Sequence, residues 1–112
     1  MSPRFYMTDK KLVLTTASSQ EEARKLANAL VERRLAACVN ILPKIYSIYR
    51  WKEQIEEVQE FLLLIKTTQS AISKLREAIQ ELHSYEIPEC IVLAIEDGSE
   101  SYLKWIEGSV TA

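Results

Sequence analysis

Glycine, histidine and cysteine are scarce in this chain of 112 residues, which contains two glycines, one histidine and two cysteines. Gly98 and Gly108 do not form a glycine-rich loop, so a backbone cradle for nucleotide phosphates is not expected. Cys38 and Cys90 lie far apart in the sequence and lack Cys-x-x-Cys spacing. This argues against a disulfide framework or a metal cluster and favours two buried free thiols.

The sequence also lacks an excess of charge and a long apolar run. Its 14 basic and 16 acidic residues nearly balance and are interspersed, so neither nucleic acid nor a membrane surface is an expected partner. No apolar stretch is long enough to cross a bilayer, and residues 1–10 lack the apolar core of an export signal. We therefore expect a cytoplasmic protein with a single domain over residues 1–112, of which residues 1–10 form a flexible N-terminal segment.

The hydrophobic periodicity of the chain predicts an α+β fold. A β-type run at residues 11–16 leads to Ser19 and Glu22, which have capping-box spacing and precede an amphipathic helical pattern. Between residues 37 and 66 the period changes to two, which predicts two long strands joined by a short polar turn. Pro43 lies within the first of these strands and predicts a bulge or an edge position, because proline cannot donate to the ladder.

A second helix is predicted from residue 71 or 72 to residue 82, with Thr68 or Ser70 as its N-cap. A strand follows at residues 90–96, and a short helix around Trp105 closes the pattern. The order βαββαβ plus a C-terminal helix predicts a ferredoxin-like two-layer sandwich with the strands arranged fourth, first, third, second. The two cysteines should then lie on opposite edges of the sheet.

Two of the predicted strands are apolar at both odd and even positions. Residues 61–65 and 90–95 show this pattern, which is typical of strands buried on both faces. Two helices can cover only one face of the sheet, and the C-terminal helix is too short to cover the other. The strand predicted from residue 37 to 50 is more than twice the usual length, so its end should extend beyond the helices. We expect a closed homo-oligomer in which sheets pack face to face.

The segment His83-Ser84-Tyr85-Glu86-Ile87-Pro88-Glu89 brings an imidazole, a phenol and carboxylates together directly before a buried strand. Segments of this kind run over the surface at the mouth of a sheet, where ligands often bind. His83 could ligate a metal with the help of Glu86 or Glu89. Alternatively, His83 is a polar C-cap near the last carbonyls of the preceding helix. The residues alone leave both interpretations open.

Five motifs, in their order and spacing, resemble the CutA divalent-cation-tolerance family from Leu12 to Trp105. They are Glu32-Arg33-Arg34-Leu35-Ala36-Ala37-Cys38-Val39-Asn40, Ile48-Tyr49-Arg50-Trp51-Lys52, Leu64-Ile65-Lys66-Thr67, the segment from His83 to Glu89, and Tyr102-Leu103-Lys104-Trp105. The resemblance implies a ferredoxin-like homotrimer, architecturally similar to the PII nitrogen-signalling proteins. It also implies a link to tolerance of copper and other divalent metals.

The resemblance further implies a reduced copper site. In the bacterial members of the family that bind copper, the ligands are a cysteine at the end of the first strand and two adjacent histidines after the second helix. This sequence has Thr15 and Leu82-His83 at those positions. The metal ligands carried over are therefore His83 and Glu89, which would form a weak and unselective copper site. No cofactor is expected to be required.

The matching positions also suggest a pocket at a subunit junction. Trp51, Lys66, Tyr85 and Glu89 combine an apolar wall with both signs of charge, which suits a small anionic or zwitterionic ligand. Alternatively, Trp51 packs an interface while Lys66 and Glu89 form an ion pair. We therefore predict a non-enzymatic trimer that binds metal weakly in the response to metal ions, with a PII-like small-molecule sensor as the alternative. Catalysis is disfavoured because no triad or nucleophile-elbow motif is present.

Overall fold

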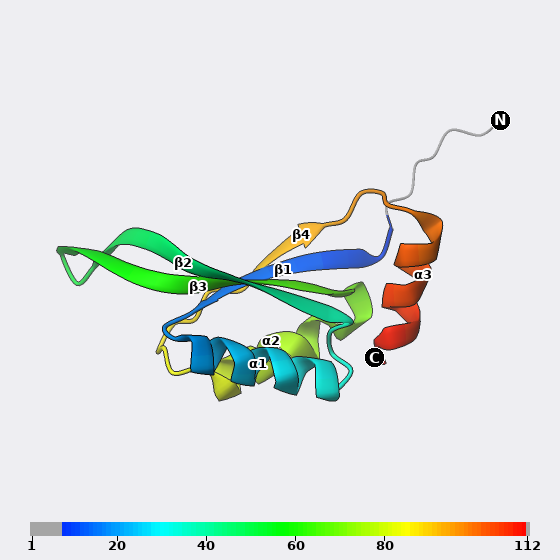
Figure 1. The fold of residues 1–112 in the computed structure, drawn as a ribbon, viewed down its shortest axis with the longest axis horizontal. Helices are drawn as coiled ribbons and strands as arrows, with labels where there is room; N and C mark the ends of the chain where they lie inside the picture. The colour runs from blue at the N-terminus through cyan, green and yellow to red at the C-terminus, as the bar shows by residue number, and fades with distance from the viewer. Residues whose placement is uncertain (1–7, 112) are drawn as a thin grey trace.

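The computed structural model describes residues 8–111 and has an α+β architecture (Figure 1). Its elements are β1 (Lys10–Ala17), α1 (Gln20–Glu32), β2 (Cys38–Trp51), β3 (Gln54–Thr68), a 3₁₀ turn (Gln69–Ala71), α2 (Ile72–Leu82), β4 (Ile91–Ala94) and α3 (Glu100–Ser109). The sheet has four strands in the order β2-β3-β1-β4, and every neighbouring pair is antiparallel. This order confirms the predicted ferredoxin-like sandwich. The helices α1 and α2 lie on one face of the sheet, whereas α3 stands at one end of it (Figure 1).

The start of β1 differs from the sequence-based expectation. The flexible segment predicted for residues 1–10 falls mostly outside the described residues, but Lys10 contradicts it, because Lys10 is buried and is the first residue of β1. Its amine contacts the carboxylates of Asp9 at 2.5 Å and Glu107 at 3.0 Å. The ion pair with Glu107 holds the beginning of β1 against α3, which explains why the strand starts earlier than the apolar pattern suggested.

The helix α1 begins as its sequence predicts. The Ser19 hydroxyl accepts a hydrogen bond from the Glu22 amide at 3.1 Å, as in a capping box. The Glu22 carboxylate does not return to Ser19; it accepts hydrogen bonds from the amide and the hydroxyl of Ser18, both at 3.0 Å. On its inner side the helix buries Leu26 and Leu30 against the sheet.

The helix α2 begins differently from the prediction. Neither Thr68 nor Ser70 caps it; their hydroxyls lie 3.1 Å apart and bond to each other. The chain instead enters α2 through the 3₁₀ turn, and Ala71 occupies the N-cap position without a side-chain hydrogen bond. The helix thus begins from a tight 3₁₀ turn, and no described side chain accepts a hydrogen bond from its first amides.

The β2–β3 hairpin is long and irregular at two points. Its strands have 14 and 15 residues, and the two turn residues between them, Lys52 and Glu53, have positive φ values of 51° and 70°. This primed turn is formed without the glycine or asparagine that normally signals it. The register shifts between Leu42 and Ile45, which confirms the bulge predicted at Pro43. We call residues 45–60 the arm, because this part of the hairpin extends beyond the helices (Figure 1).

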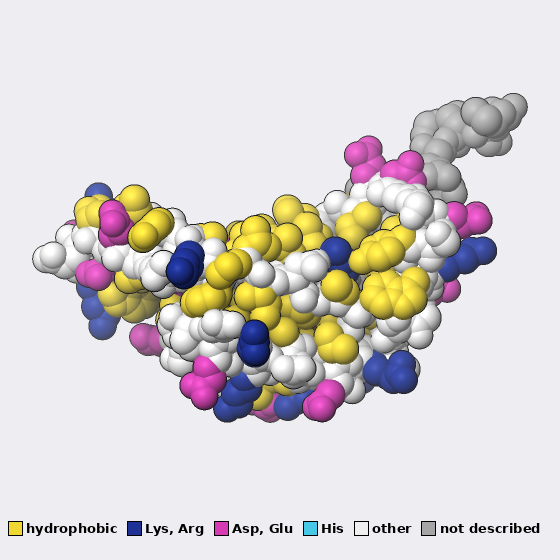
Figure 2. All heavy atoms as spheres, in the orientation of Figure 1, with side chains coloured by type: hydrophobic (Ala, Val, Ile, Leu, Met, Phe, Trp, Pro, Cys, Tyr) yellow, Lys and Arg dark blue, Asp and Glu magenta, His cyan; other side chains and the backbone are white. Residues whose placement is uncertain are grey.

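Only one face of the sheet is covered by α1 and α2. On that face Val13, Leu63 and Ile65 are completely buried. We call the opposite side the open face; strand alternation and register assign to it Leu12, Leu14, Leu42, Leu62, Leu64, Ile91 and Leu93. Of these, Leu42, Ile91 and Leu93 are between 40% and 48% exposed. Hydrophobic side chains gather over the strands in Figure 2.

The two cysteines lie at opposite edges of the sheet, as the strand order predicted. Cys38 begins β2, and Cys90 directly precedes β4, which is shorter than the predicted strand at residues 90–96. Both are free thiols. Among the described residues, no helix has the length and apolar character needed to cross a membrane.

Candidate functional site

A cavity of about 800 Å³ lies between the arm and the segment that follows α2. We call it the arm pocket. Its lining comes from the end of β1 (Thr16), from the arm (Ser47, Ile48, Tyr49, Trp51, Glu60) and from the segment after α2 (Ser84, Tyr85, Glu86, Ile87, Pro88, Glu89). The strand register places Ser47, Tyr49, Trp51 and Glu60 on the same side of the hairpin as the open face, so the pocket continues that face.

The segment after α2 is held in place through His83. The helix ends there because the backbone of His83 is extended, with φ −81° and ψ 146°, and its amide donates to the Ile79 carbonyl at 2.9 Å. His83 is thus the C-cap residue, but its ring points away from the helix carbonyls and toward β1. The side chain of His83 is fully buried.

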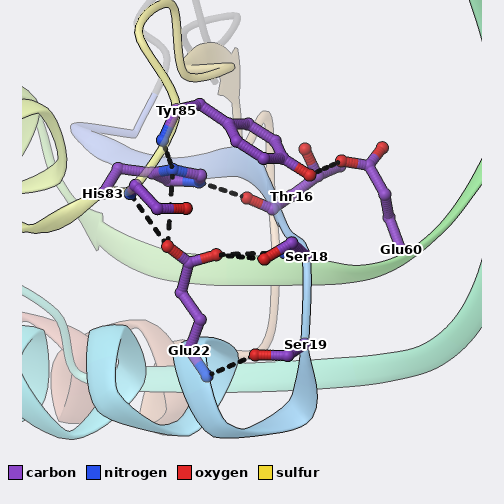
Figure 3. Close-up of polar contacts among 8 residues, drawn as sticks. Thr16, Ser18, Ser19, Glu22, Glu60, His83 and Tyr85 are labelled. Carbon is purple, nitrogen blue, oxygen red and sulfur yellow. Dashed lines mark hydrogen bonds and ion pairs between the residues drawn. The ribbon is translucent and has the colours of Figure 1, made fainter.

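Both ring nitrogens of His83 have backbone partners (Figure 3). The Tyr85 amide donates to Nδ1 at 3.0 Å, so the ring proton is on Nε2, which donates to the Thr16 carbonyl at 2.6 Å. The imidazole therefore connects the end of β1 with the segment after α2. The Tyr85 ring lies against it, with the two ring centroids 4.6 Å apart.

Glu22 ties the same segment to the start of α1. One of its carboxylate oxygens accepts from the Ser84 amide at 2.9 Å, while the other accepts from Ser18 (Figure 3). Desolvation raises the pKa of Glu22, but the hydrogen bonds from Ser84 and Ser18 outweigh this effect and lower the pKa to about 2. Glu22 is therefore ionised at neutral pH and fixes the first residue after His83.

Tyr85 and Glu60 both line the arm pocket and are in direct contact. The Tyr85 hydroxyl donates to the Glu60 carboxylate at 2.5 Å (Figure 3). Burial raises the pKa of the Tyr85 phenol, and the hydrogen bond to Glu60 raises it further. The phenol therefore stays protonated and remains a donor. Glu60 is only 5% exposed, which is unusual for a carboxylate.

Glu89 adds a second carboxylate to the pocket. Desolvation raises the pKa of Glu89, and the nearby Glu60 raises it further by repulsion between like charges. Among the residues that line the pocket, three are glutamates and none is lysine or arginine. The arm pocket of this chain is therefore acidic.

The structure brings together three of the four residues that the sequence assigned to the pocket. Trp51, Tyr85 and Glu89 all line it, whereas Lys66 does not. Lys66 is six residues beyond Glu60 on β3, about 20 Å away along an extended strand. Its amine donates to the Tyr102 hydroxyl at 3.3 Å and lies 5.5 Å from the centre of that ring. In a single chain, Lys66 therefore belongs to the α3 end of the sheet.

The two residues assigned to a metal have different surroundings. His83 already uses both ring nitrogens for hydrogen bonds, while Glu89 lines the arm pocket. Among residues 8–111, no group of three or more histidine, cysteine, aspartate or glutamate side chains is arranged to hold a metal ion. Thr15, at the position of the family cysteine, is completely buried on the covered face of the sheet.

Two features of the site were not predicted from the sequence: Glu60, and the link from Glu22 to Ser84. Glu60 directly precedes an apolar run, and strand alternation places it on the same face as Leu62, which was an available signal for a buried carboxylate. The contact between Glu22 and Ser84 joins residues 62 positions apart, and no local pattern indicates it.

Comparisons with known proteins agree with this fold. The family model of the CutA1 divalent ion tolerance protein matches residues 11–109. The divalent-cation tolerance protein CutA of Thermus thermophilus is 52% identical over 97 residues, which cover 87% of this chain and 94% of that protein. The chloroplastic protein CutA of Arabidopsis thaliana is 44% identical over 98 residues, 88% of this chain, which spans 54% of that relative.

The structural comparison gives the same result. The solved structure of the divalent cation tolerance protein from Thermus thermophilus superimposes with a TM-score of 0.89 and 49% identity. The match covers 91% of this chain and 99% of that one. The family match, the sequence identity and the shared fold together show that the chain belongs to the CutA1 divalent ion tolerance family.

Proposed function

We propose that this protein takes part in the response to divalent cations as a non-enzymatic cytoplasmic homotrimer, and that its functional site is the arm pocket. The observation that carries this proposal is a cavity of about 800 Å³ where an aromatic wall and carboxylates converge, with Trp51, Tyr85 and Glu89 in its lining. A volume of this size suits a small molecule better than a bare metal ion. The protein would then act like a PII-type sensor, changing its interactions when the ligand is bound.

The trimer is supported by the open face of the sheet. Among residues 8–111, only its end is covered, where α3 lies near Lys10 and Lys66. The remaining leucines and isoleucines form a contiguous apolar surface, which monomeric proteins rarely expose. A cyclic assembly that packs these faces together would remove it from water. Size exclusion coupled to light scattering should give three times the chain mass; a monomeric mass at micromolar concentration would contradict the proposal.

The surroundings of the cysteines support a non-enzymatic role. The Cys38 thiol donates to the Asn40 side chain at 3.8 Å. Burial raises the pKa of Cys90, although the nearby Arg76 opposes this shift. A raised pKa reduces the thiolate fraction and therefore the nucleophilicity. Among the described residues, neither cysteine forms a hydrogen bond with His83, as a nucleophile and its base would.

Weak copper binding by His83 and Glu89 is a second candidate function, favoured by the divalent-ion description of the family. A metal at His83 would have to displace the Tyr85 amide from Nδ1 or the Thr16 carbonyl from Nε2. We therefore expect affinity no tighter than micromolar. Calorimetry with copper on the wild type and on His83→Ala tests this candidate; nanomolar binding that survives the substitution would place the copper site elsewhere.

A tolerance assay separates the two candidates. A bacterial host without its own family gene, exposed to excess copper or zinc, should be complemented by the wild-type chain and by Trp105→Phe. Trp51→Ala, which removes the main aromatic wall, should fail to complement if the arm pocket is the functional site. Full complementation by Trp51→Ala would reject the pocket as that site. Metal analysis of protein purified without chelator or tag completes the test, since stoichiometric copper would favour the second candidate.

A further inference from the structure

The one histidine of the chain decides whether the divalent ion in the family description has an imidazole ligand here. Imidazole is the commonest metal ligand among protein side chains. A site built on it needs a nitrogen lone pair that is not otherwise used, further ligands that converge on the same point, and access for the ion. The surroundings of His83 can be compared with each of these requirements.

The lone pair of His83 is already used inside the fold (Figure 3). A neutral imidazole has one nitrogen that accepts and one that donates. Nδ1 accepts from the Tyr85 amide at 3.0 Å, and Nε2 donates to the Thr16 carbonyl at 2.6 Å. Neither ring nitrogen is among the described buried side-chain atoms that lack a partner. A metal at either nitrogen would therefore break a hydrogen bond that the fold already makes, which costs free energy.

The groups around the ring do not form a ligand set. The carboxylate in contact with the ring is that of Glu22, whose Oε2 lies 3.7 Å from Nδ1. Both oxygens of Glu22 already accept hydrogen bonds, from Ser84 and from Ser18. Glu89 lines the arm pocket, and among residues 8–111 no hydrogen bond or ion pair joins it to His83. The same residues contain no group of three potential ligands that could hold an ion.

The ring is also enclosed by its own chain. The side chain of His83 is fully buried, and the Tyr85 ring packs on it with the two centroids 4.6 Å apart. The groups that surround it belong to the end of β1, the start of α1 and the segment after α2. Further subunits that associate as rigid bodies add cover and open no path to the ring. The comparison is therefore the same for one chain and for a closed oligomer.

We infer that His83 does not ligate a divalent cation in the folded chain, and that it is instead a positioning residue for Tyr85. The imidazole fixes the Tyr85 amide and packs on its ring, and Tyr85 in turn lines the arm pocket. The inference goes beyond the proposed function, because it removes His83 from the second candidate and does not depend on what the arm pocket binds. The response to divalent cations would then proceed without a histidine-bound metal.

The single histidine allows a direct test on the full-length chain. Isotope-labelled histidine gives one imidazole in the nitrogen NMR spectrum. At neutral pH the spectrum should show a proton on Nε2 and none on Nδ1, and an excess of zinc should leave both nitrogen shifts unchanged. Zinc is the probe because it has no redox chemistry and binds imidazole well. A shift of either nitrogen with zinc in the folded chain, or a proton on Nδ1 in place of Nε2, would overturn the inference.

Three substitutions separate positioning from ligation. His83→Asn offers an amide oxygen toward the Tyr85 amide, and His83→Gln offers an amide nitrogen toward the Thr16 carbonyl, whereas His83→Ala offers neither. Hydrogen exchange of the Tyr85 amide should be about tenfold or more faster in His83→Ala than in the wild type, and His83→Asn should recover part of the protection. Circular dichroism verifies that each variant is folded. Unchanged protection of the Tyr85 amide in His83→Ala and His83→Gln would contradict the positioning role.

Calorimetry with copper and with zinc completes the test. Any binding by the wild type should be retained in His83→Asn and His83→Gln, because the ion is then held by other groups. Binding that weakens about tenfold or more in both folded variants would show that the imidazole is a ligand and would overturn the inference. Complementation by Trp51→Ala would reject the arm pocket as the functional site and would leave the inference about His83 standing, so the two failures are distinguishable.

Discussion

The two faces of the sheet are built from the same strands but have different surroundings. In β3, Leu63 and Ile65 face α1 and α2 and are completely buried, whereas Leu62 and Leu64 face the other way and are partly exposed. Both sets are equally apolar. An apolar residue in a strand therefore shows only that its burial is favourable; the rest of the fold or another subunit decides what covers it.

The largest expected effect is a loss of stability, caused by a substitution that creates a cavity on the covered face. Leu63→Ala should lower the free energy of unfolding by about 2–5 kcal/mol, because the fully enclosed site cannot collapse around the smaller side chain. Urea denaturation measures the change. Leu62→Ala, on the neighbouring open face, is the control, and an equal loss in both variants at concentrations where the chain is monomeric would remove the distinction between the faces.

A charge on the open face should act on assembly rather than on the fold of the subunit. Leu64→Glu would bury a carboxylate at the proposed interface and should weaken association about a hundredfold or more. Light scattering across a dilution series measures it, and circular dichroism should show an intact α+β fold. If the variant is still trimeric at the concentration at which the wild-type trimer dissociates, Leu64 lies outside the interface.

Glu22 connects the start of α1 with the segment after α2. Its substitution should cause a smaller, pH-dependent loss of stability. Glu22→Gln should cost about 1–2 kcal/mol at neutral pH, because hydrogen bonds to a charged acceptor are replaced by bonds to a neutral one. The pKa of Glu22 is about 2 in the folded chain against 4.5 as the ordinary value, so its contribution is present above about pH 4.5. It is lost as the pH falls toward 2.

Denaturation at several pH values tests whether the contribution of Glu22 to stability falls as the pH is lowered. The stability difference between the wild type and Glu22→Gln should shrink between pH 4.5 and 2. Glu21→Gln changes an exposed neighbour and serves as the control. A difference that stays constant down to pH 2 would contradict the role assigned to the ionised Glu22 carboxylate.

The smallest expected effect is a change in stability when either of two buried threonines on the covered face is replaced. The Thr67 hydroxyl donates to the Leu35 carbonyl at 2.6 Å, whereas the Thr15 hydroxyl is buried without a partner among the described residues. Thr15→Val should therefore stabilise the fold by about 1 kcal/mol, and Thr67→Val should destabilise it by about the same amount. Thermal unfolding of both variants measures the contrast; a destabilised Thr15→Val would reveal a partner for that hydroxyl.

Much of the fold could be predicted from local patterns. The capping residues of α1, the period of two in β2 and β3, and Pro43 each determine a local conformation, and the structure has these features where they were expected. The start of α2 was missed because a 3₁₀ turn replaced the expected cap. The early start of β1 was missed because it depends on an ion pair between Lys10 and Glu107, which are 97 positions apart.

The candidate site was predictable only where local patterns position its residues. Tyr85 and Glu89 follow the end of a helix and precede a strand, so a local pattern placed them at the mouth of the sheet. The presence of Glu60 and the distance of Lys66 depend on how the arm lies against the segment after α2. No spacing in the sequence encodes that arrangement.

Sequence patterns were enough to predict the order and type of the elements and the two apolar faces, because helix and strand periodicities act over a few residues. The strand order followed from the order of these elements. The chemistry of the site, in contrast, depends on how distant segments pack together. This packing turned both nitrogens of His83 toward backbone partners, and it placed the carboxylate of Glu60 in the arm pocket, whose lining within one chain does not include Lys66. The physical reason is that the charge of a pocket is a sum over side chains from distant segments, and only the packing of those segments brings them together.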